Sequence, residues 1–281
     1  MKCRGKDSNA IDLHICSPKK DQPFIPHTSR TCILHVHGGG MSVLSTMDPI
    51  YRATRLRLAE MGFTVIGVEF RNAAGRLGPH RFPAGLNDCL SALDYVYANK
   101  KKMNIDKIML LGESGGANLS LAMALQASQN NMHHMIDGVY ALCPYIYGDY
   151  NIASKDKDGS LPSLIENDGL LLPRCEAMHI MSDLYLPDGE LPSENPLAWP
   201  YHASIEMMEG LPPHVISVNE LDPCRDEGLE YCEKLVTAGV VARSRVVKGT
   251  CHAGELLFMK YIPDIFASTL NDVNDFAKTL I

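Results

Sequence analysis

A predicted strand, a five-residue turn and a predicted helix follow one another without a gap near the middle of the chain. Residues 107–111 are mostly apolar and predict a buried strand, and a helical pattern runs from about 115 to 128. The turn between them reads GESGG at 112–116, with Ser114 at its centre. A sharp strand-to-helix turn strains the serine backbone and exposes its hydroxyl above a sheet, which is typical of a nucleophile.

The residues around Ser114 suit this interpretation. Gly112 and Gly116 lack a Cβ atom, so neighbouring backbone can approach the turn closely. Glu113 is expected to support the same turn, and the helix that begins after Ser114 would supply backbone N–H groups and a positive dipole end. The alternative interpretation is a serine helix cap flanked by glycines that allow close packing.

A second glycine run, HGGG at 37–40, comes directly after another predicted strand. Acyl transfer develops negative charge on a carbonyl oxygen, and this charge needs N–H donors that already point at it. Backbone N–H groups of glycines can do this because no side chain blocks the substrate. Gly38, Gly39 and Gly115 are therefore the predicted donors.

The remaining residues of this loop are expected to support it. His37 is predicted to orient the loop through a hydrogen bond, with Gly40 as a further supporting residue. A phosphate-binding loop is the alternative for a glycine run after a strand. Neither the G-x-G-x-x-G pattern nor the G-x-x-x-x-G-K-[ST] pattern occurs here, which disfavours that alternative.

A serine nucleophile needs a histidine that accepts its proton and a carboxylate that orients the histidine. In chains with this type of turn the order is serine, acid, histidine. Six histidines follow Ser114, and His252 lies between glycines in a loop after a predicted strand, so it is the predicted base. His179 and His202 lie in a longer irregular segment and could line the pocket.

The predicted acid is Asp222, which follows a predicted strand at 215–218. The proline after Asp222 fixes the turn and keeps the aspartate out of the helical region. Glu220 and Asp226 remain alternatives. Asp226 and Glu227 also read as first-turn acids of a helix at 226–238, where the helix dipole favours negative charge.

Strands and helices alternate along the rest of the chain. This order predicts an α/β fold with a mostly parallel twisted sheet flanked by helices. We expect one domain over 1–281, with 145–213 as a cap or lid insertion, because that stretch is long, irregular and rich in Pro, Gly, Asp and Ser. A surface elaboration without a role in binding is the alternative. Strands are predicted at 11–16, 31–36, 63–70, 107–111, 138–143, 215–218 and 243–247, and helices at 49–61, 86–101, 115–128, 226–238 and 263–280.

Composition excludes several classes of protein. Hydrophobic residues make up 46% of the 281 residues, which is enough for a large core, and the net charge of −7 argues against a nucleic-acid partner. Nine scattered cysteines, without a Cys-x-x-Cys pair or zinc-ligand spacing, predict reduced thiols in a cytoplasmic protein and no metal site. No 18-residue apolar run and no apolar segment near the start are present, so neither a membrane span nor a signal peptide is expected.

Longer stretches resemble the hormone-sensitive-lipase-like family of α/β-hydrolase carboxylesterases, from Ile11 almost to the end of the chain. The resemblance implies an eight-stranded sheet with a cap, Ser114, Asp222 and His252 as a catalytic triad, and an oxyanion hole from the three glycines already named. It also implies short-acyl ester substrates, no cofactor and, as in some members, a homodimer. The matching stretches include HVHGGGMSVLST (35–46), LGESGGANL (111–119) and LPPHVISVNELDPCRDEG (211–228).

Three features depart from the commoner family pattern. The residues around the serine are Glu and Gly, where Asp and Ala are commoner. Cys251 places a thiol beside His252, either as a small buried filler or as a site sensitive to alkylation. Only 36 residues precede His37, so the chain is expected to have a shortened N-terminus and to begin near the second strand of the fold. Either the cap is reduced, or the chain is a truncated, inactive product.

The expected reaction is hydrolysis of small or short-acyl esters, lactones included, through an acyl-enzyme on Ser114. His252 would deprotonate the serine and later activate the water that releases the acyl group. Two alternatives remain. The same triad could hydrolyse an amide or N-acetyl group, or the chain could be a non-catalytic small-molecule binder built on this fold.

Overall fold

The computed structural model describes residues 1–18, 30–151 and 161–280. Its strands are β1 (Lys2–Arg4), β2 (Ala10–Cys16), β3 (Thr31–Val36), β4 (Thr64–Glu69), β5 (Lys107–Glu113), β6 (Gly138–Leu142), β7 (His214–Asn219) and β8 (Ala242–Val247). Its α-helices are α1 (Pro49–Glu60), α2 (Ala84–Ala98), α3 (Gly115–Gln129), α4 (Ser163–Glu166), α5 (Cys175–Tyr185), α6 (Ile205–Met208), α7 (Arg225–Thr237), α8 (Gly254–Leu257) and α9 (Pro263–Thr279).

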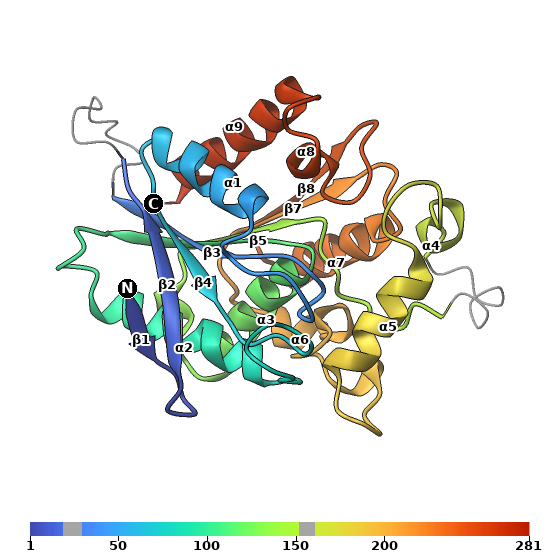
Figure 1. The fold of residues 1–281 in the computed structure, drawn as a ribbon, viewed down its shortest axis with the longest axis horizontal. Coiled ribbons are helices and arrows are strands. Elements are labelled where there is room, and N and C mark those ends of the chain that lie inside the picture. Colours follow the sequence, from blue (N-terminus) through green and yellow to red (C-terminus); the bar gives the residue numbers. More distant parts are fainter. Residues whose placement is uncertain (19–29, 152–160, 281) are drawn as a thin grey trace.

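The described strands form one eight-stranded sheet in the order β1-β2-β4-β3-β5-β6-β7-β8 (Figure 1). β2 pairs antiparallel with β1 and β4, and the other neighbouring strands are parallel. The fold predicted from the alternating pattern is therefore confirmed. Parallel strands bring their carboxyl ends to one edge of the sheet, and the turns after β3, β5, β7 and β8 meet there.

The expectation that the chain begins near the second strand of the fold is wrong. β1 occupies Lys2–Arg4 and pairs with β2, so the sheet has its outer antiparallel strand. The backbone N–H of Gly5 donates to the carbonyl of Asn9 (2.8 Å) in the turn between them. A three-residue strand with one buried side chain, Cys3, is too short to show an alternating pattern in the sequence.

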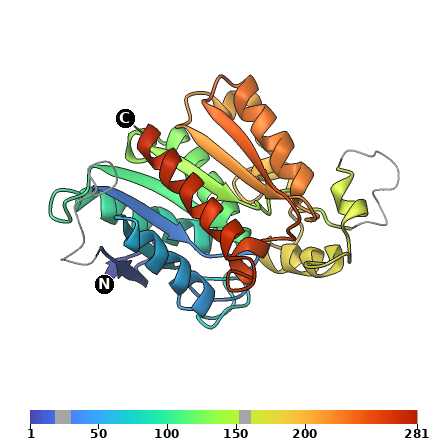
Figure 2. The ribbon, with the colours of Figure 1, turned by 90° about the horizontal axis from the view of Figure 1, so that it is seen from above.

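Helices cover both faces of the sheet (Figures 1 and 2). The apolar side chains of α2, α3 and α7 pack into one buried cluster, which includes Leu93, Leu121 and Leu235. Those of α1, α8 and α9 pack into a second cluster, which includes Leu58 and Val273. The sheet separates these two cores, so the turns at its edge follow strands that are buried on both faces.

The segment predicted as an insertion, 145–213, is described except for 152–160. Its helices α4 and α5 lie at one end of the sheet in both views (Figures 1 and 2). Two hydrogen bonds tie α5 to the start of the segment: Tyr145 Oη donates to the carbonyl of Met178, and Ser182 Oγ donates to the carbonyl of Gly148 (2.5 Å). The buried Trp199 packs edge-on against Tyr145, with ring centroids 5.2 Å apart.

The helices are short relative to a lipid bilayer. Within 1–18, 30–151 and 161–280, no helix is both long enough and apolar enough to cross a membrane.

Candidate active site

Ser114 lies between β5 and α3 in a positive-φ backbone conformation, with φ +56° and ψ −120°. This region is costly for a residue with a side chain and persists only where surrounding contacts hold it. The backbone supplies such contacts. Ser114 N donates to the carbonyl of Leu142 (2.9 Å), and the Ser114 carbonyl accepts from Asn118 N (3.0 Å). The strained turn projects the Ser114 side chain away from the sheet edge.

Two glycines make this turn possible. A Cβ on Gly112 would lie 2.1 Å from the carbonyl oxygen of Gly116, and a Cβ on Gly116 would lie 1.9 Å from that of Val36. Both distances are far below van der Waals contact, and the obstructing atoms belong to backbone. The role predicted for these glycines, close approach of neighbouring backbone, agrees with these contacts.

The structure brings Ser114, His252 and Asp222 into one hydrogen-bonded chain. Nε2 of His252 lies 2.7 Å from Oγ of Ser114, and Nδ1 lies 2.7 Å from Oδ2 of Asp222. Asp222 is fully buried, while the His252 side chain is 13% exposed. A buried acid behind a partly accessible imidazole, with a hydroxyl in front, is the arrangement required for proton transfer from a serine.

The immediate surroundings fix the Asp222 carboxylate. Its Oδ1 accepts the backbone N–H of Cys224 (2.9 Å), so both carboxylate oxygens have partners. Asn167 donates to the main-chain carbonyl of Asp222 (3.1 Å). The alternative acids lie elsewhere: Glu220 pairs with Lys248 (2.9 Å), and Asp226 pairs with Arg225 (2.7 Å). Of these acids, only Asp222 is hydrogen-bonded to His252.

Burial and charge act in opposite directions on His252. Burial lowers the pKa of the imidazole, but the charge and hydrogen bond of Asp222 and the nearby Glu255 carboxylate raise it, and the pKa ends above its ordinary value. Glu255 is itself buried and is held by Asn219 Nδ2 (2.7 Å). A negative environment of this kind stabilises the imidazolium that forms when the histidine accepts a proton.

The glycine loop after β3 wraps over the start of α3. Gly39 and Gly40 have φ of +102° and +59°. A Cβ on Gly115 would lie only 2.8 Å from the backbone nitrogen of Gly40, which shows how closely the two segments approach. Gly38 lies beside Tyr51: a Cβ on Gly38 would be 3.0 Å from the Tyr51 hydroxyl oxygen. Burial raises the pKa of this hydroxyl well above its ordinary value.

His37 lies behind this loop. Its Nδ1 is 2.8 Å from the carbonyl oxygen of Gly38, and its ring stacks on Phe70 with centroids 4.3 Å apart. Burial lowers the pKa of His37 to about 4, so the ring is neutral near pH 7. Contacts through the backbone and an aromatic neighbour agree with the predicted orienting role.

Glu113 points away from the hydroxyl chain into a buried polar network. Its Oε2 is 3.0 Å from Nε2 of His35, and Nδ1 of His35 is 3.4 Å from a guanidinium nitrogen of Arg55. Arg55 donates in turn to the carbonyl of Thr46 (2.6 Å). This network joins the residue before Ser114 to β3, α1 and the loop after the glycine run, so it stiffens the base of the site.

A cavity of about 280 Å³ opens above Ser114. Ser114 and His252 form its floor, and the glycine loop forms one wall. Helix α5 contributes Met178 and Met181, of which Met181 would contact a Cβ on Gly40 at 2.7 Å through its sulfur. The other walls are mostly apolar and come from Val43, Leu44, Ile50, Tyr51, Glu113, Tyr145, Pro173, Ala253, Leu256 and Leu257.

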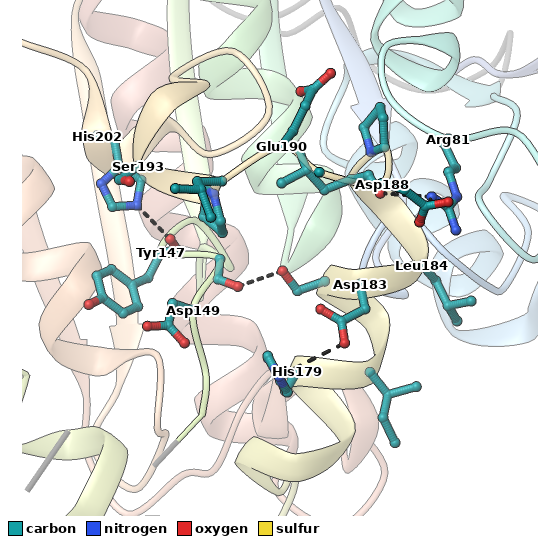
Figure 3. A pocket seen from close by; sticks show the side chains of 18 residues that line it. Arg81, Tyr147, Asp149, His179, Asp183, Leu184, Asp188, Glu190, Ser193 and His202 are labelled. Carbon is teal, nitrogen blue, oxygen red and sulfur yellow. Dashed lines mark hydrogen bonds and ion pairs between the residues drawn. The ribbon is translucent and has the colours of Figure 1, made fainter. Parts of the chain in front are cut away.

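A second, larger cavity of about 750 Å³ lies on the other side of α5 (Figure 3). His179 and His202 line this cavity and not the one above Ser114. An ion pair between Arg81 and Asp188 (2.5 Å) crosses its rim. Neither Ser114 nor His252 lines the second cavity, so its size does not make it the site of serine chemistry.

Sequence reasoning missed several residues around the hydrogen-bonded chain. Asn219 and Glu255 support the His252 loop, and Asn167 supports Asp222, but isolated polar residues give no signal of such roles. Glu227 lies in the first turn of α7, as predicted, but its burial gave no signal in the sequence. It is fully buried and accepts hydrogen bonds from the backbone N–H of Ile146 (2.7 Å) and from Tyr150 Oη (2.9 Å).

The comparisons with known proteins agree with this geometry. A family model described as the α/β-hydrolase fold matches residues 33–255, and the chain belongs to that family. The arylesterase of Saccharolobus solfataricus is 29% identical over 257 residues, which cover 90% of this chain and 75% of the arylesterase. Carboxylesterase NlhH of Mycobacterium tuberculosis is 31% identical over 223 residues, which cover 78% of this chain and 64% of NlhH.

Solved structures give a similar result. Brefeldin A esterase, titled a bacterial homologue of human hormone-sensitive lipase, is 38% identical with a TM-score of 0.93, and the match covers 99% of this chain and 75% of that one. Esterase Est22 is 36% identical with a TM-score of 0.87 over 99% of this chain and 80% of its own. By class, the chain is a carboxylesterase-type serine hydrolase of the hormone-sensitive-lipase-like group.

Proposed function

We propose that the protein hydrolyses small, short-acyl carboxylic esters, lactones included, through an acyl-enzyme on Ser114. The observation that carries this proposal is the continuous chain from Ser114 through His252 to Asp222, with two contacts of 2.7 Å. A serine hydroxyl is a weak nucleophile at neutral pH unless a positioned base takes its proton. The chain supplies that base and a buried carboxylate that orients it.

The proposed reaction has two halves. Nε2 of His252 accepts the Ser114 proton as Oγ attacks the ester carbonyl, while Nδ1–H donates to Asp222. The imidazolium then protonates the departing alcohol. In the second half, His252 activates a water molecule that attacks the acyl-enzyme and restores Ser114. Asp222 stays ionised throughout and stabilises the imidazolium.

The negative charge on the reacting oxygen needs donors from the glycine loop and from the start of α3. The sequence favours Gly38, Gly39 and Gly115. We propose these three N–H groups as the donors, with Gly40 as a further candidate. The positive φ values of Gly39 and Gly40 and the closeness of Gly40 N to Gly115 support this choice.

The cavity above Ser114 supports small substrates. Its volume of about 280 Å³ is below the usual range for drug-sized ligands, and its walls are mainly apolar. Met178 and Met181 of α5 form the wall that faces the glycine loop. We therefore propose that 145–213 acts as a cap that limits the acyl chain, within a single domain spanning 1–281.

Two further expectations extend the proposal. All nine cysteines are free thiols, which supports a reducing compartment such as the cytoplasm. The homodimer implied by the family resemblance stays a prediction, and sedimentation of the purified protein tests it. Amide or N-acetyl hydrolysis by the same residues, and binding without catalysis, remain the competing functions.

Hydrolysis of p-nitrophenyl esters from acetate to laurate tests the proposal. Wild-type protein should prefer the short esters, and Ser114→Ala should lose turnover while it keeps the same unfolding transition. Well-folded wild-type protein without ester hydrolysis would exclude the esterase function. Anilides of the same acids, assayed in parallel, separate amide hydrolysis from ester hydrolysis.

A further inference from the structure

A cysteine thiol lies beside the acid and the base of the candidate site. Cys143 follows β6, Asp222 follows β7 and His252 follows β8, so three neighbouring parallel strands bring these side chains to the same edge of the sheet. One ligand atom from each residue lies within 4.8 Å of the other two. A sulfur, a carboxylate oxygen and an imidazole nitrogen therefore face a common volume.

The backbone holds Cys143 in this place. Its φ of +38° is in the left-handed region, which residues with side chains seldom adopt. The N–H of Cys143 donates to the carbonyl of Ser217 on β7 (2.7 Å), and the following residues are tied back by Tyr145 N, which donates to the Ser114 carbonyl (3.4 Å). Burial raises the pKa of the thiol well above its ordinary value, so the group is a neutral S–H near pH 7.

From this geometry we propose that Cys143, Asp222 and His252 form a binding site for a thiophilic divalent cation, such as Zn²⁺ or Cd²⁺, whose occupation inhibits the enzyme. The inhibitory part rests on the proposed esterase function, and the binding part does not. Three protein ligands of the sulfur, nitrogen and oxygen types, with a fourth position open, form a recognised coordination set for zinc.

The distances permit the ion with a small adjustment. Zinc binds these atom types at about 2.0–2.3 Å in a tetrahedron, so two ligands of one ion are roughly 3.3–3.8 Å apart. The three side chains must therefore close slightly around the cation. If the ion binds Nδ1, the 2.7 Å hydrogen bond between His252 and Asp222 opens, because the ion takes the place of the shared proton.

The chemical balance is simple. The S–H bond of Cys143 breaks, a sulfur–metal bond forms, and the proton leaves to solvent. One carboxylate and one thiolate then offset the two charges of the cation. No oxidant or reductant is involved, since neither the metal nor the sulfur changes oxidation state.

Inhibition follows whichever ring nitrogen of His252 binds the metal. A metal on Nε2 occupies the lone pair that would accept the Ser114 proton. A metal on Nδ1 leaves the remaining ring proton on Nε2, which then donates and cannot accept. In both cases the hydroxyl loses its base, and we expect turnover to fall at least tenfold, as loss of general-base catalysis typically does.

Cys251 provides a matched control. It is also buried and is the immediate sequence neighbour of His252, yet its sulfur is not part of the group that converges with Asp222 and His252. If any thiol near the site could cause the inhibition by metal ions, the inhibition should depend on both Cys143 and Cys251. An effect that arises from the proposed site should depend on Cys143 alone.

The test is a titration of chelator-treated protein with Cd²⁺, Zn²⁺ and Mg²⁺. Binding is read from the ultraviolet cadmium–thiolate band, and inhibition from p-nitrophenyl acetate hydrolysis. Wild type and Cys251→Ser should show the band and lose activity with Cd²⁺ and Zn²⁺, whereas Mg²⁺, which prefers oxygen ligands, should have no effect. Cys143→Ser should show a smaller band and at least tenfold weaker inhibition.

Equal bands and equal inhibition in Cys143→Ser and Cys251→Ser would overturn the site. Absence of any Cd²⁺ band in the wild type would overturn it as well. If Cys143→Ser does not fold, Cys143→Ala replaces it in the titration. The ¹¹³Cd chemical shift of the wild-type protein is a second test of the site and should indicate one sulfur ligand at one bound ion. Wild-type protein that binds Cd²⁺ but hydrolyses no ester would refute the proposed function and leave the metal site supported.

Discussion

Nδ1 of His252 lies 2.7 Å from Oδ2 of Asp222, and this contact joins the loop after β8 to the turn after β7. Thirty residues separate the two side chains in sequence. The contact fixes which imidazole nitrogen carries the proton, because a carboxylate can only accept. Nε2 is thereby left as the acceptor that faces Ser114 at 2.7 Å.

Asp222→Asn is expected to lower kcat by about 10⁴-fold, because an amide at this position favours the wrong tautomer of His252. The fold should be retained, since the side-chain volume barely changes. Steady-state kinetics with p-nitrophenyl acetate measure the effect. Glu220→Gln is the control, because Glu220 bonds to Lys248 and Gly249 and not to His252. A comparable loss in both variants would contradict the assignment of Asp222.

The pH dependence of kcat/KM should follow the protonation of His252. The base must be neutral to accept the Ser114 proton, so activity should rise with pH through the pKa of His252 in the free enzyme. Burial lowers that pKa, but Asp222 and Glu255 raise it above the ordinary value of 6.5, so the acidic limb should have its midpoint above 6.5. Asp222→Asn should move the midpoint to lower pH, and an unchanged midpoint would show that another group controls the profile.

Met181→Ala should broaden the acyl-chain preference. The Met181 side chain contacts the glycine loop and forms part of the cavity wall, so its removal should let longer chains enter. The ratio of kcat/KM for octanoate to that for acetate should rise about tenfold. Leu184→Ala, which lines the second cavity and not the one above Ser114 and is 38% exposed, is the control and should leave the ratio unchanged. Equal octanoate-to-acetate ratios in the two variants would contradict a role for Met181 in selecting the acyl chain.

Glu227→Gln should change how stability depends on pH. Burial raises the pKa of Glu227 from 4.5 to about 8, so the folded state holds its proton more tightly than the unfolded state. The associated stability is present below about pH 4.5 and is lost as pH rises through 8. The variant should therefore be more stable than the wild type at pH 9, by roughly 2–4 kcal/mol, and similar at pH 5.

Urea unfolding at the two pH values measures this difference. Glu233→Gln, an exposed position on the same helix, is the control and should show no such pH-dependent gain. A Glu227→Gln variant that is less stable than the wild type at both pH values would instead mean that the carboxylate's hydrogen bonds to the start of the insertion outweigh its burial.

Periodicity alone predicted the fold well where elements are long and buried. The helix at 86–101 is expected from Leu86, Leu90, Leu93 and Val96 on one face. Helix α2 buries Leu86, Leu93 and Val96, and Leu90 is half-buried. β1 escaped detection because three residues cannot show a pattern. Helix boundaries differ by up to three residues because terminal turns depend on packing that sequence does not display.

The candidate site was predictable where chemistry imposes a local pattern. Ser114 has glycines at fixed offsets, and the order of acid and histidine narrows the search for Asp222 and His252. Cys143 has no such pattern, because its closeness to His252 arises from three separate strand ends. The burial of Glu227 could not be predicted, because nothing in its own helix reveals that the chain near Ile146 covers it.

Covalent labelling with a fluorophosphonate, followed by peptide mapping, tests the central claim most directly. The reagent reacts with a serine that a nearby base has activated, and it needs no knowledge of the natural ester. The account predicts one adduct per chain, located on Ser114, with labelling that disappears in Ser114→Ala and falls strongly in His252→Ala. An adduct on any other residue, or no adduct on folded wild-type protein, would contradict it.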